Sequence, residues 1–403
     1  MKIGIIGAGA SGVFCAINLA QHNLDVTLLE KNEDTLKKLL ITGNGRCNVT
    51  NLKDVINFVE GVTQNGKFIY SAISGFSPVD MVEFLNNLSV ETKVENNNRV
   101  FPVTNKAITI KNAFDNCLNN VNLVLGCLVT SVEVINNKFK VLTTKGDFVF
   151  DKLIVATGGL SYPTTGSTGD GLRFAENLNI LTTKTRPSLC GIRLNFDSQK
   201  LEGVSFNGKL VYKSNLKNKC ESVGDFIFTN YGVSGPAVFT LTSKIVDYSI
   251  SKNFIYIDFL STMQTEQILL NLKEYIKLNP KKYVVHCVNS LVNLKLCKII
   301  LERLNIPENL QVANLKNEQL NKIVFELKNF ELQIEGFDNI ERATVTRGGV
   351  DVKEINPKTF ECKKIKNIYF IGEVLDVDAL SGGYNLQIAF STAYACASAI
   401  IND

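Results

Sequence analysis

Three short apolar runs, each ending in a glycine-rich turn, predict an α/β fold built on a parallel sheet. The runs cover residues 3–6, 152–156 and 367–371. Buried strands that lead through glycines into helices are typical of parallel sheets with helices on both faces. Residues 189–344 interrupt this pattern with short alternating strands and amphipathic segments. The sequence therefore predicts an α/β domain, formed by residues 1–188 and 345–403, that is split by an inserted domain of another kind.

The first run opens into a glycine turn with the GxGxxG spacing of dinucleotide-binding loops. Gly7 permits the tight turn, Gly9 lets the backbone approach a pyrophosphate, and Gly12 lets the next helix pack closely on the strand. Unpaired N–H groups at the start of that helix, around Ala10 and Ser11, would hold the phosphates. We expect a Rossmann-type dinucleotide site here. Glycines that only shape a turn are the alternative.

A helix is expected over about 11–21 and a second strand over 25–29, and Glu30 follows directly after this strand. Glu30 lies 18 residues after Gly12, about where an acidic side chain accepts hydrogen bonds from an adenosine ribose. We expect Glu30 and its neighbour Lys31 to bind the cofactor. A carboxylate at this position also argues against a 2′-phosphate.

A polar, glycine-punctuated segment follows at residues 38–51. Loops at the carboxyl ends of parallel strands surround the ligand. Arg46, Cys47 and Asn48 are therefore candidates for contacts in the same cleft. An ordinary exposed loop is the alternative.

A β-meander is expected over residues 121–150, with its first strand over 123–125, before the strand over 152–156. Thr157, Gly158 and Gly159 end that strand, and a second glycine-rich stretch occupies 161–171. Because glycines let the backbone approach a ligand closely, these residues are a second set of candidate contacts. Glycines that only form isolated turns, without contacting a ligand, are the alternative.

The inserted domain divides into a β-rich part, residues 189–260 and 329–344, and a helical part, residues 261–328. Short strands such as 209–212 and 254–258 predict an antiparallel barrel or sandwich. Four lysines of the helical part are expected to cover a solvated face, with an anion-binding surface as the alternative. They are Lys273, Lys277, Lys281 and Lys282.

The last apolar run ends in Gly372 and Glu373. A glycine pair ending at Gly383 then opens an apolar helix that contains Asn385 and Leu386. The N–H groups at a helix start attract negative charge, which suits the pyrimidine edge of a reduced flavin. A helix that simply packs on the sheet is the alternative.

The composition excludes several classes of function. The 43 basic and 39 acidic residues are spread along a chain of 403 residues with net charge +4, without a block typical of a polyanion-binding arm. No apolar stretch approaches the roughly 20 residues of a membrane helix. Ten cysteines without a C-x-x-C pair and only two histidines argue against a metal site or a histidine triad. We expect a cytoplasmic protein with no nucleic-acid partner, membrane contact or metal.

Taken together, the sequence resembles the BaiN/YhiN-type family of bacterial FAD-dependent oxidoreductases, also described as aminoacetone-oxidase-like flavoproteins. The resemblance spans nearly the whole chain. It rests on GAGASG at 7–12, TGNGRCNVTN at 42–51, RVFP at 99–102, ATGGLSYPTTGSTGDG at 156–171, TNYGVSGPAV at 229–238, TRGGV at 346–350 and GEVLDVDALSGGYNLQ at 372–387.

The resemblance implies that the candidate residues named above hold FAD. The first glycine turn would bind the pyrophosphate, Glu30 the adenosine ribose, residues 372–373 the ribityl chain and residues 383–386 the flavin ring. It adds Val129 for a backbone contact to adenine. Ala379 stands where the family is expected to have glycine.

Flavin carries the difficult redox step in such proteins. The resemblance implies hydride transfer to an activated C=C bond of a small organic substrate, with NAD(P)H as a transient donor because no second GxGxxG follows a strand. An amine oxidase using O₂, and a flavin-binding sensor or relative of RNA-modifying flavoproteins, are alternatives. The sequence assigns no catalytic residue and no oligomeric state. Tyr162, Tyr231 and Tyr384 are candidate proton donors that packing explains equally well, and Cys47 is a candidate redox thiol.

Overall fold

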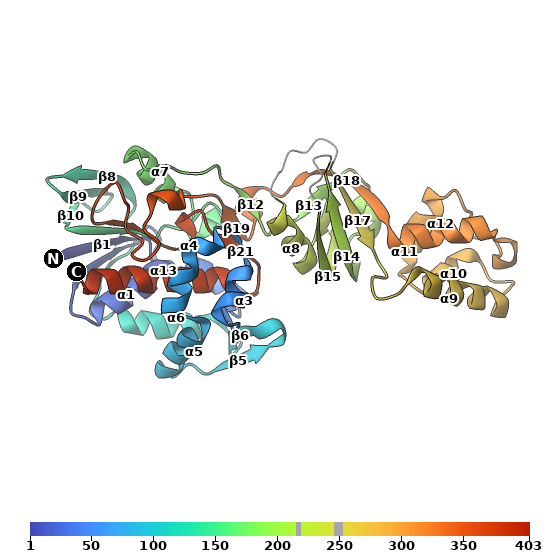
Figure 1. Ribbon diagram of the computed structural model, residues 1–403, viewed down its shortest axis with the longest axis horizontal. Coiled ribbons are helices and arrows are strands. Elements are labelled where there is room, and N and C mark those ends of the chain that lie inside the picture. The colour runs from blue at the N-terminus through green and yellow to red at the C-terminus, as the bar shows by residue number, and fades with distance from the viewer. Residues whose placement is uncertain (215–218, 246–252) are drawn as a thin grey trace. The chain divides into compact units, whose positions relative to one another are not determined.

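The computed structural model describes residues 1–214, 219–245 and 253–403. The chain folds into two compact units (Figure 1). The first unit comprises Met1–Ser188 and Asn339–Asp403, and the second comprises Leu189–Asp338. Each unit has its own sheet structure and its own buried side chains.

A five-stranded parallel sheet forms the centre of the first unit. Its strands, in spatial order, are β20 (Ile368–Phe370), β11 (Lys152–Val155), β1 (Lys2–Ile6), β2 (Asp25–Leu29) and β7 (Asn122–Val124). Each neighbouring pair is parallel. The chain leaves β1 toward β2 on one side and reaches β11 on the other side. The carboxyl end of β1 is therefore the topological switch point at which such sheets bind ligands.

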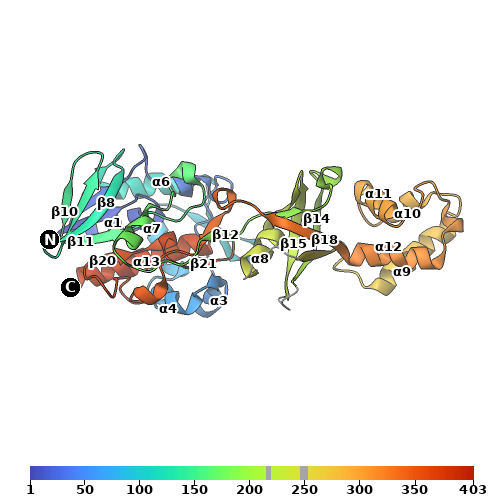
Figure 2. The ribbon, with the colours of Figure 1, turned by 90° about the horizontal axis from the view of Figure 1, so that it is seen from above.

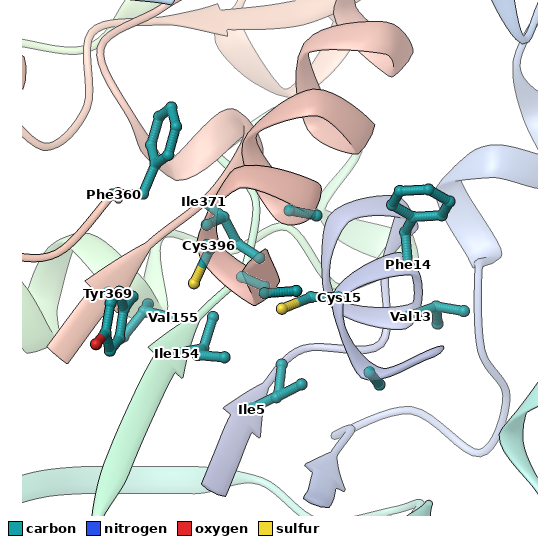
Figure 3. Packing of buried hydrophobic residues seen from close by; sticks show 14 of the residues in the cluster. Ile5, Val13, Phe14, Cys15, Ile154, Val155, Phe360, Tyr369, Ile371 and Cys396 are labelled. Atoms are coloured by element: carbon teal, nitrogen blue, oxygen red, sulfur yellow. The ribbon is translucent and has the colours of Figure 1, made fainter. Parts of the chain in front are cut away.

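Two helices cover one face of this sheet. They are α1 (Ala10–Ala20) and α13 (Tyr384–Ile401), which pack against each other. Ile5 and Ile154 project from neighbouring strands toward Cys15 of α1 and Cys396 of α13 (Figure 3). The apolar character of the first and last segments of the chain is explained by this shared core, in which side chains from both ends of the sequence are buried.

Smaller elements surround the parallel sheet. The strands β8 (Val129–Ile135), β9 (Lys138–Thr143) and β10 (Phe148–Phe150) form an antiparallel sheet, as predicted. The assignment of residues 123–125 to this meander was wrong, because β7 pairs with β2 and extends the parallel sheet. The other elements of this unit are α2 (Lys37–Ile41), β3 (Thr50–Asn51), α3 (Val55–Glu60), β4 (Val62–Gln64), α4 (Gly66–Gly75), α5 (Pro78–Asn87), β5 (Thr92–Glu95), β6 (Arg99–Pro102), α6 (Ala107–Asp115), α7 (Asp170–Asn177), β12 (Arg186–Ser188), β19 (Val345–Arg347) and β21 (Asp378–Ala379).

The second unit combines a closed antiparallel barrel with helices (Figure 2). The barrel strands, in spatial order, are β13 (Ile192–Leu194), β16 (Gly232–Ser234), β15 (Lys219–Thr229), β14 (Ser205–Lys213), β17 (Phe254–Asp258) and β18 (Phe330–Phe337). Its helices are α8 (Pro236–Lys244), α9 (Thr265–Leu278), α10 (Val284–Asn289), α11 (Leu294–Arg303) and α12 (Asn317–Lys328). The predicted fold class, an α/β fold interrupted by a barrel-like and helical insertion, is confirmed.

Within the described parts of the chain, no helix has both the length and the apolar character needed to cross a membrane.

Candidate functional site

The first glycine turn lies at the carboxyl end of β1, where the sheet has its switch point. Gly7 has a φ angle of 103°, and a Cβ atom there would lie 2.7 Å from the carbonyl oxygen of Ala156. A Cβ atom on Gly12 would lie only 1.9 Å from the carbonyl oxygen of Gly7. Both positions therefore require glycine for the turn and for the packing of α1, whatever else binds there.

Gly9 differs from these two glycines. Among the described residues other than its own chain neighbours, no heavy atom would lie within 4 Å of a Cβ atom built on Gly9. Gly9 caps α1, and the described structure has no side-chain cap and no acidic residue in the first turn of this helix. The positive end of α1, with Ala10 and Ser11 in its first turn, thus adjoins open space. This arrangement fits the pyrophosphate of a dinucleotide.

Glu30 is fixed beside the same turn. Its Oε2 accepts a hydrogen bond from the N–H of Ala8 at 2.7 Å. Its Oε1 accepts hydrogen bonds from the backbone N–H and the side-chain amide of Asn32, at 2.8 and 2.6 Å. The residue is only 8% exposed. Because both oxygens already accept protein hydrogen bonds, a ribose bound at Glu30 would share or replace them.

Lys31 and Asn32 connect the end of β2 to the second glycine-rich stretch. The ammonium of Lys31 pairs with Asp170 at 2.7 Å and also contacts Thr168. The side-chain amide of Asn32 donates to the carbonyl oxygen of Thr165 at 3.2 Å. Burial raises the pKa of Asp170, but the hydrogen bond and charge of Lys31 outweigh it and bring that pKa below its ordinary value. The predicted cofactor residue Lys31 therefore already has an ionic partner in the protein.

Val129 lies near Glu30 through its chain neighbours. The N–H of Cys127 donates to the carbonyl oxygen of Glu30 at 2.8 Å, and the N–H of Gly126 donates to that of Asn32 at 2.9 Å. Val129 begins β8 two residues later and is buried. The structure thus brings this segment beside Glu30, and the backbone contact to adenine stays a prediction.

The glycines after β11 are explained by packing within the protein. A Cβ atom on Gly159 would lie 2.4 Å from the Oγ1 atom of Thr346. That hydroxyl accepts hydrogen bonds from the N–H groups of Leu160 and Ser161, at 2.8 and 3.1 Å. Gly159 is therefore needed for the approach of β19. Gly158 has a φ angle of 72°, which also favours glycine.

Thr157 is different, because its buried hydroxyl has no hydrogen-bond partner among the described residues. Leaving such a group unsatisfied costs about 1–3 kcal/mol. The hydroxyl follows β11, the strand next to β1. Its oxygen would lie only 2.3 Å from a Cβ atom built on Gly171 of α7, so the hydroxyl faces the interior of the protein and its position explains a second glycine.

Glu373 joins three segments that the sequence predicted separately. Its Oε2 pairs with the ammonium of Lys38 at 2.8 Å. Its Oε1 accepts from the hydroxyl of Ser161 at 3.1 Å and from the N–H of Thr346 at 3.0 Å. Lys38 also donates to Ser161 at 2.7 Å. The sequence analysis missed Lys38, Ser161 and Thr346 as partners, although all three lie in or beside the matching blocks.

Gly372 brings the end of β20 to the first turn of α1. It has a φ angle of 73°, and a Cβ atom there would lie 2.5 Å from the hydroxyl oxygen of Ser11. Its N–H donates to the hydroxyl of Thr392 in α13 at 3.0 Å. The beginning and the end of the chain therefore meet at the predicted cofactor site.

Arg46 and Cys47 make contacts within the protein. The guanidinium of Arg46 lies 4.0 Å from the ring centre of Phe101 and pairs with Glu95 at 3.0 Å. Cys47 is fully buried, and burial raises the pKa of its thiol to about 12. A thiol with this pKa stays protonated at neutral pH. The structure therefore gives no support to Cys47 as a redox thiol.

Asn48 helps to hold the start of α13. With its amide oriented to satisfy its neighbours, its oxygen accepts from the N–H of Gly383 at 3.1 Å, and its nitrogen donates to the carbonyl oxygens of Thr50 and Val100 at 3.1 and 3.2 Å. Gly383 has a φ angle of 98°, and a Cβ atom there would lie 2.3 Å from the carbonyl group of Thr50. Asn48 and Gly383 thus fix the helix start that was predicted to face the flavin.

The loop before α13 is closed by Asn385. Its Oδ1 accepts from the N–H of Ala379 at 3.1 Å, and its Nδ2 donates to the carbonyl oxygen of the same residue at 3.0 Å. Leu386 packs partly buried against the core. Ala379, which departs from the expected glycine, therefore contributes its backbone to this loop.

A buried ion pair that the sequence analysis missed lies beside this loop. Arg347 donates to both carboxylate oxygens of Asp378 at 2.8 and 2.9 Å, and the two side chains are only 3% and 1% exposed. The hydroxyl of Thr63 accepts from Arg347 at 2.7 Å, and that of Ser188 donates to Asp378 at 2.7 Å. Arg347 and Asp378 occur in the blocks TRGGV and GEVLDVDALSGGYNLQ. Their presence in these blocks is the only signal that the sequence offered.

The three candidate tyrosines are in different surroundings. Tyr384 is buried, with its ring centre 4.7 Å from that of Phe58. The ring centre of Tyr162 lies 6.0 Å from the ammonium of Lys38. Tyr231 belongs to the second unit and is 41% exposed. Packing therefore accounts for Tyr384, and the role of proton donor is not assigned to any of the three.

The described residues contain no cluster of three or more histidine, cysteine, aspartate or glutamate side chains arranged to hold a metal ion.

Solved structures with this fold include flavoenzyme chains. A flavocytochrome c3 fumarate reductase superposes with a TM-score of 0.53 at 14% identity, over 100% of this chain and 78% of its own. The 3-ketosteroid-delta4-(5alpha)-dehydrogenase of Rhodococcus jostii gives 0.53 at 12% identity, over 99% of this chain and 96% of its own. At such low identity the likeness shows the fold of this class alone.

The chain belongs to the family described as the HI0933-like protein Rossmann domain, whose profile matches residues 1–399. It is 31% identical to the "Ribosomal RNA dihydrouridine synthase" of Haemophilus influenzae, over 98% of this chain and 97% of that protein. It is 31% identical to the Escherichia coli protein of the same name and 29% identical to the "3-dehydro-bile acid delta(4,6)-reductase" of Clostridium scindens, with the same coverage. The predicted family is thus confirmed, and the protein is an FAD-dependent oxidoreductase.

Proposed function

We propose that this protein reduces a C=C bond conjugated to a carbonyl group, with FAD as its cofactor and NAD(P)H as the electron donor. The names of the relatives support the reaction type. Dihydrouridine is uridine with its ring C=C bond reduced, and a delta(4,6)-reductase of a 3-dehydro-bile acid also acts on C=C bonds. In both cases the bond is activated by a carbonyl group in conjugation. The match of these relatives over nearly the whole chain is the observation that carries the proposal.

Two substrate classes follow from the same names. Uridine in ribosomal RNA is our first candidate, because two relatives at 31% identity carry that name. A small conjugated ketone is the second, and it falls within the small organic substrates with an activated C=C bond that the sequence analysis predicted. The prediction of no nucleic-acid partner rested on the even spread of charge, and the names of the two relatives argue against it.

The chain's own residues would hold FAD along the carboxyl edge of the sheet. The start of α1, next to Gly9, would bind the pyrophosphate, and Glu30 would accept from the ribose. The ion pair between Lys38 and Glu373 links residues 38–51 to the end of β20, the segment that would approach the ribityl chain. When bound, FAD supplies hydride transfer.

The start of α13 would orient the flavin ring. Asn48 holds Gly383 in place, and Asn385 closes the preceding loop. The N-terminal N–H groups of an 18-residue helix stabilise negative charge, which develops on the pyrimidine edge when flavin is reduced. These residues therefore favour the reduced cofactor without themselves changing protonation.

Anaerobic titration tests the reductase proposal. We expect NADH or NADPH to bleach the absorbance of the oxidised flavin, and we expect turnover with protein-free ribosomal RNA to leave dihydrouridine, detected by mass spectrometry of nucleosides. A small conjugated ketone in place of RNA tests the second substrate class. Oxidation of aminoacetone in air, with O₂ reduced to hydrogen peroxide, would instead favour the oxidase. A bound flavin that neither NADH nor NADPH reduces would contradict the proposal and favour a sensor.

A further inference from the structure

The net charge of the chain is concentrated in its helical part. Residues 261–328 contain ten lysines and arginines and six acidic residues, so their net charge of +4 equals that of the whole protein. The remaining residues are balanced in charge. An excess of positive charge gathered on one part of a fold, rather than spread over it, is the electrostatic pattern of polyanion-binding surfaces.

Within this part, four lysines follow one another from α9 into the turn before α10. Lys273 and Lys277 are four residues apart in α9 and therefore lie on the same face of the helix, about 6 Å apart along its axis. Lys281 and Lys282 follow α9 after Asn279 and Pro280, and all four lysines are exposed. Among the described residues, none of the four has an ion-pair partner within 4.0 Å, whereas Lys298, Arg303 and Lys322 of α11 and α12 do.

Two exposed aromatic side chains adjoin these lysines. Tyr283 is 46% exposed, and its ring lies nearly parallel to that of the exposed His286, with 6.3 Å between the ring centres and an angle of 21°. Aromatic rings held at the surface beside lysines bind single-stranded nucleic acid, because bases stack on them while the backbone meets the positive charges. The packing of α10 against α9 places both kinds of group on neighbouring elements.

We propose that this surface binds RNA. It is formed by Lys273, Lys277, Lys281, Lys282, Tyr283 and His286, and we call it the lysine surface. The lysines contact the phosphodiester backbone, and Tyr283 stacks on an unpaired base. A row of charges that begins in α9 and continues into the following turn matches a linear polyanion better than it matches a single phosphate. The inference rests on the proposed function, because the RNA bound by this surface is the substrate class proposed there.

The test measures RNA affinity as a function of salt. The variant carries Lys273→Gln, Lys277→Gln, Lys281→Gln and Lys282→Gln, and the probe is protein-free ribosomal RNA. We expect about 100-fold weaker binding near ~0.1 M salt, and a slope of log K against log salt that is shallower by about 3, since four phosphate contacts to a single strand are lost. Tyr283→Ala is expected to weaken binding about tenfold through lost stacking.

A matched control removes the same charge elsewhere. Lys67, Lys106, Lys358 and Lys366 are exposed and lie in the first unit. Changing all four to Gln lowers the net charge by the same amount, so we expect RNA affinity to change less than about twofold if location rather than total charge decides binding. Glu274→Gln removes the one acidic residue of 270–286 and is expected to strengthen binding.

Several results would overturn the inference. The first is an equal loss of RNA affinity in the lysine-surface variant and in the control variant. The second is an unchanged RNA affinity in the lysine-surface variant. The third is wild-type protein that binds vesicles of acidic phospholipid but not RNA. Flavin content and flavin reduction by NAD(P)H are measured on the same preparations. Reduction and turnover of a small ketone without RNA binding would refute the lysine surface and leave the reductase intact. RNA binding by a protein whose flavin NAD(P)H does not reduce would leave the lysine surface intact and refute the reductase.

Discussion

Gly9 and Gly12 occupy the same turn, yet the structure predicts opposite effects for the same substitution. In Gly9→Ala, the new Cβ atom meets no described atom within 4 Å. The backbone angles of Gly9, φ −79° and ψ −171°, are ones that alanine adopts freely. The unfolded chain loses conformational entropy, so we expect the cofactor-free protein to become more stable by about 0.4–1 kcal/mol.

Although Gly9→Ala should stabilise the cofactor-free protein, it should weaken the binding of FAD. The methyl group of Gly9→Ala occupies the space beside the start of α1 into which the pyrophosphate is expected to fit. We expect the dissociation constant of FAD to rise at least about tenfold, which is about 1.4 kcal/mol of binding free energy. Gly12→Ala is the matched variant, because its Cβ atom would lie 1.9 Å from a carbonyl oxygen and force the backbone apart. It should destabilise the cofactor-free protein by about 1–3 kcal/mol.

Urea unfolding of the FAD-stripped proteins measures the first effect, and titration with FAD followed by flavin fluorescence measures the second. Stable protein with weak FAD binding is the result expected for Gly9→Ala alone. The reasoning is refuted if Gly9→Ala binds FAD as tightly as the wild type. It is also refuted if Gly9→Ala destabilises the cofactor-free protein as much as Gly12→Ala does.

Three further predictions concern the rest of the site. Gly159→Ala should lower the free energy of unfolding by about 1–3 kcal/mol because its Cβ atom would overlap the hydroxyl of Thr346. Urea unfolding should show that the double variant with Thr346→Ala loses less free energy of unfolding than the sum of the losses in the two single variants. Asp378→Ala should cost about 3–5 kcal/mol because it removes the buried carboxylate that pairs with the guanidinium of Arg347, and the double variant with Arg347→Met should recover part of that loss. Burial raises the pKa of the Cys47 thiol from 9.0 to about 12, so with rising pH the thiol ionises in the unfolded chain before it ionises in the folded protein. Its contribution to the free energy of unfolding is therefore complete below pH 9 and is lost as the pH rises from 9 to 12. In Cys47→Ala the free energy of unfolding should fall less over that range, and a fall equal to that of the wild type would contradict the assignment.

Much of the fold was predictable because periodic and glycine-bounded patterns are local. The strands β1, β2, β11 and β20 are buried apolar runs, and glycines whose φ angles or close contacts exclude other residues follow β1, β11 and β20. The short β7 was placed in the meander because three residues carry little pattern. Only its pairing with β2 assigns it to the parallel sheet.

The partners within the site were not predictable from local patterns. Lys38 and Glu373 are 335 residues apart in the chain, and Arg347 pairs with Asp378 in a separate block. Such ion pairs depend on how loops meet in space, which a single sequence does not reveal. The charge analysis was incomplete for another reason: near-equal totals concealed that the net charge lies within residues 261–328.

The reoxidation of reduced enzyme by substrate tests the central claim most directly. The FAD-loaded protein is reduced anaerobically with NAD(P)H, freed of excess donor, and mixed with protein-free ribosomal RNA or with a small conjugated ketone. We predict that one of these substrates restores the absorbance of oxidised flavin while a matching amount of reduced product forms. Flavin that stays reduced with both substrates, and is reoxidised only when O₂ is admitted, would contradict the account.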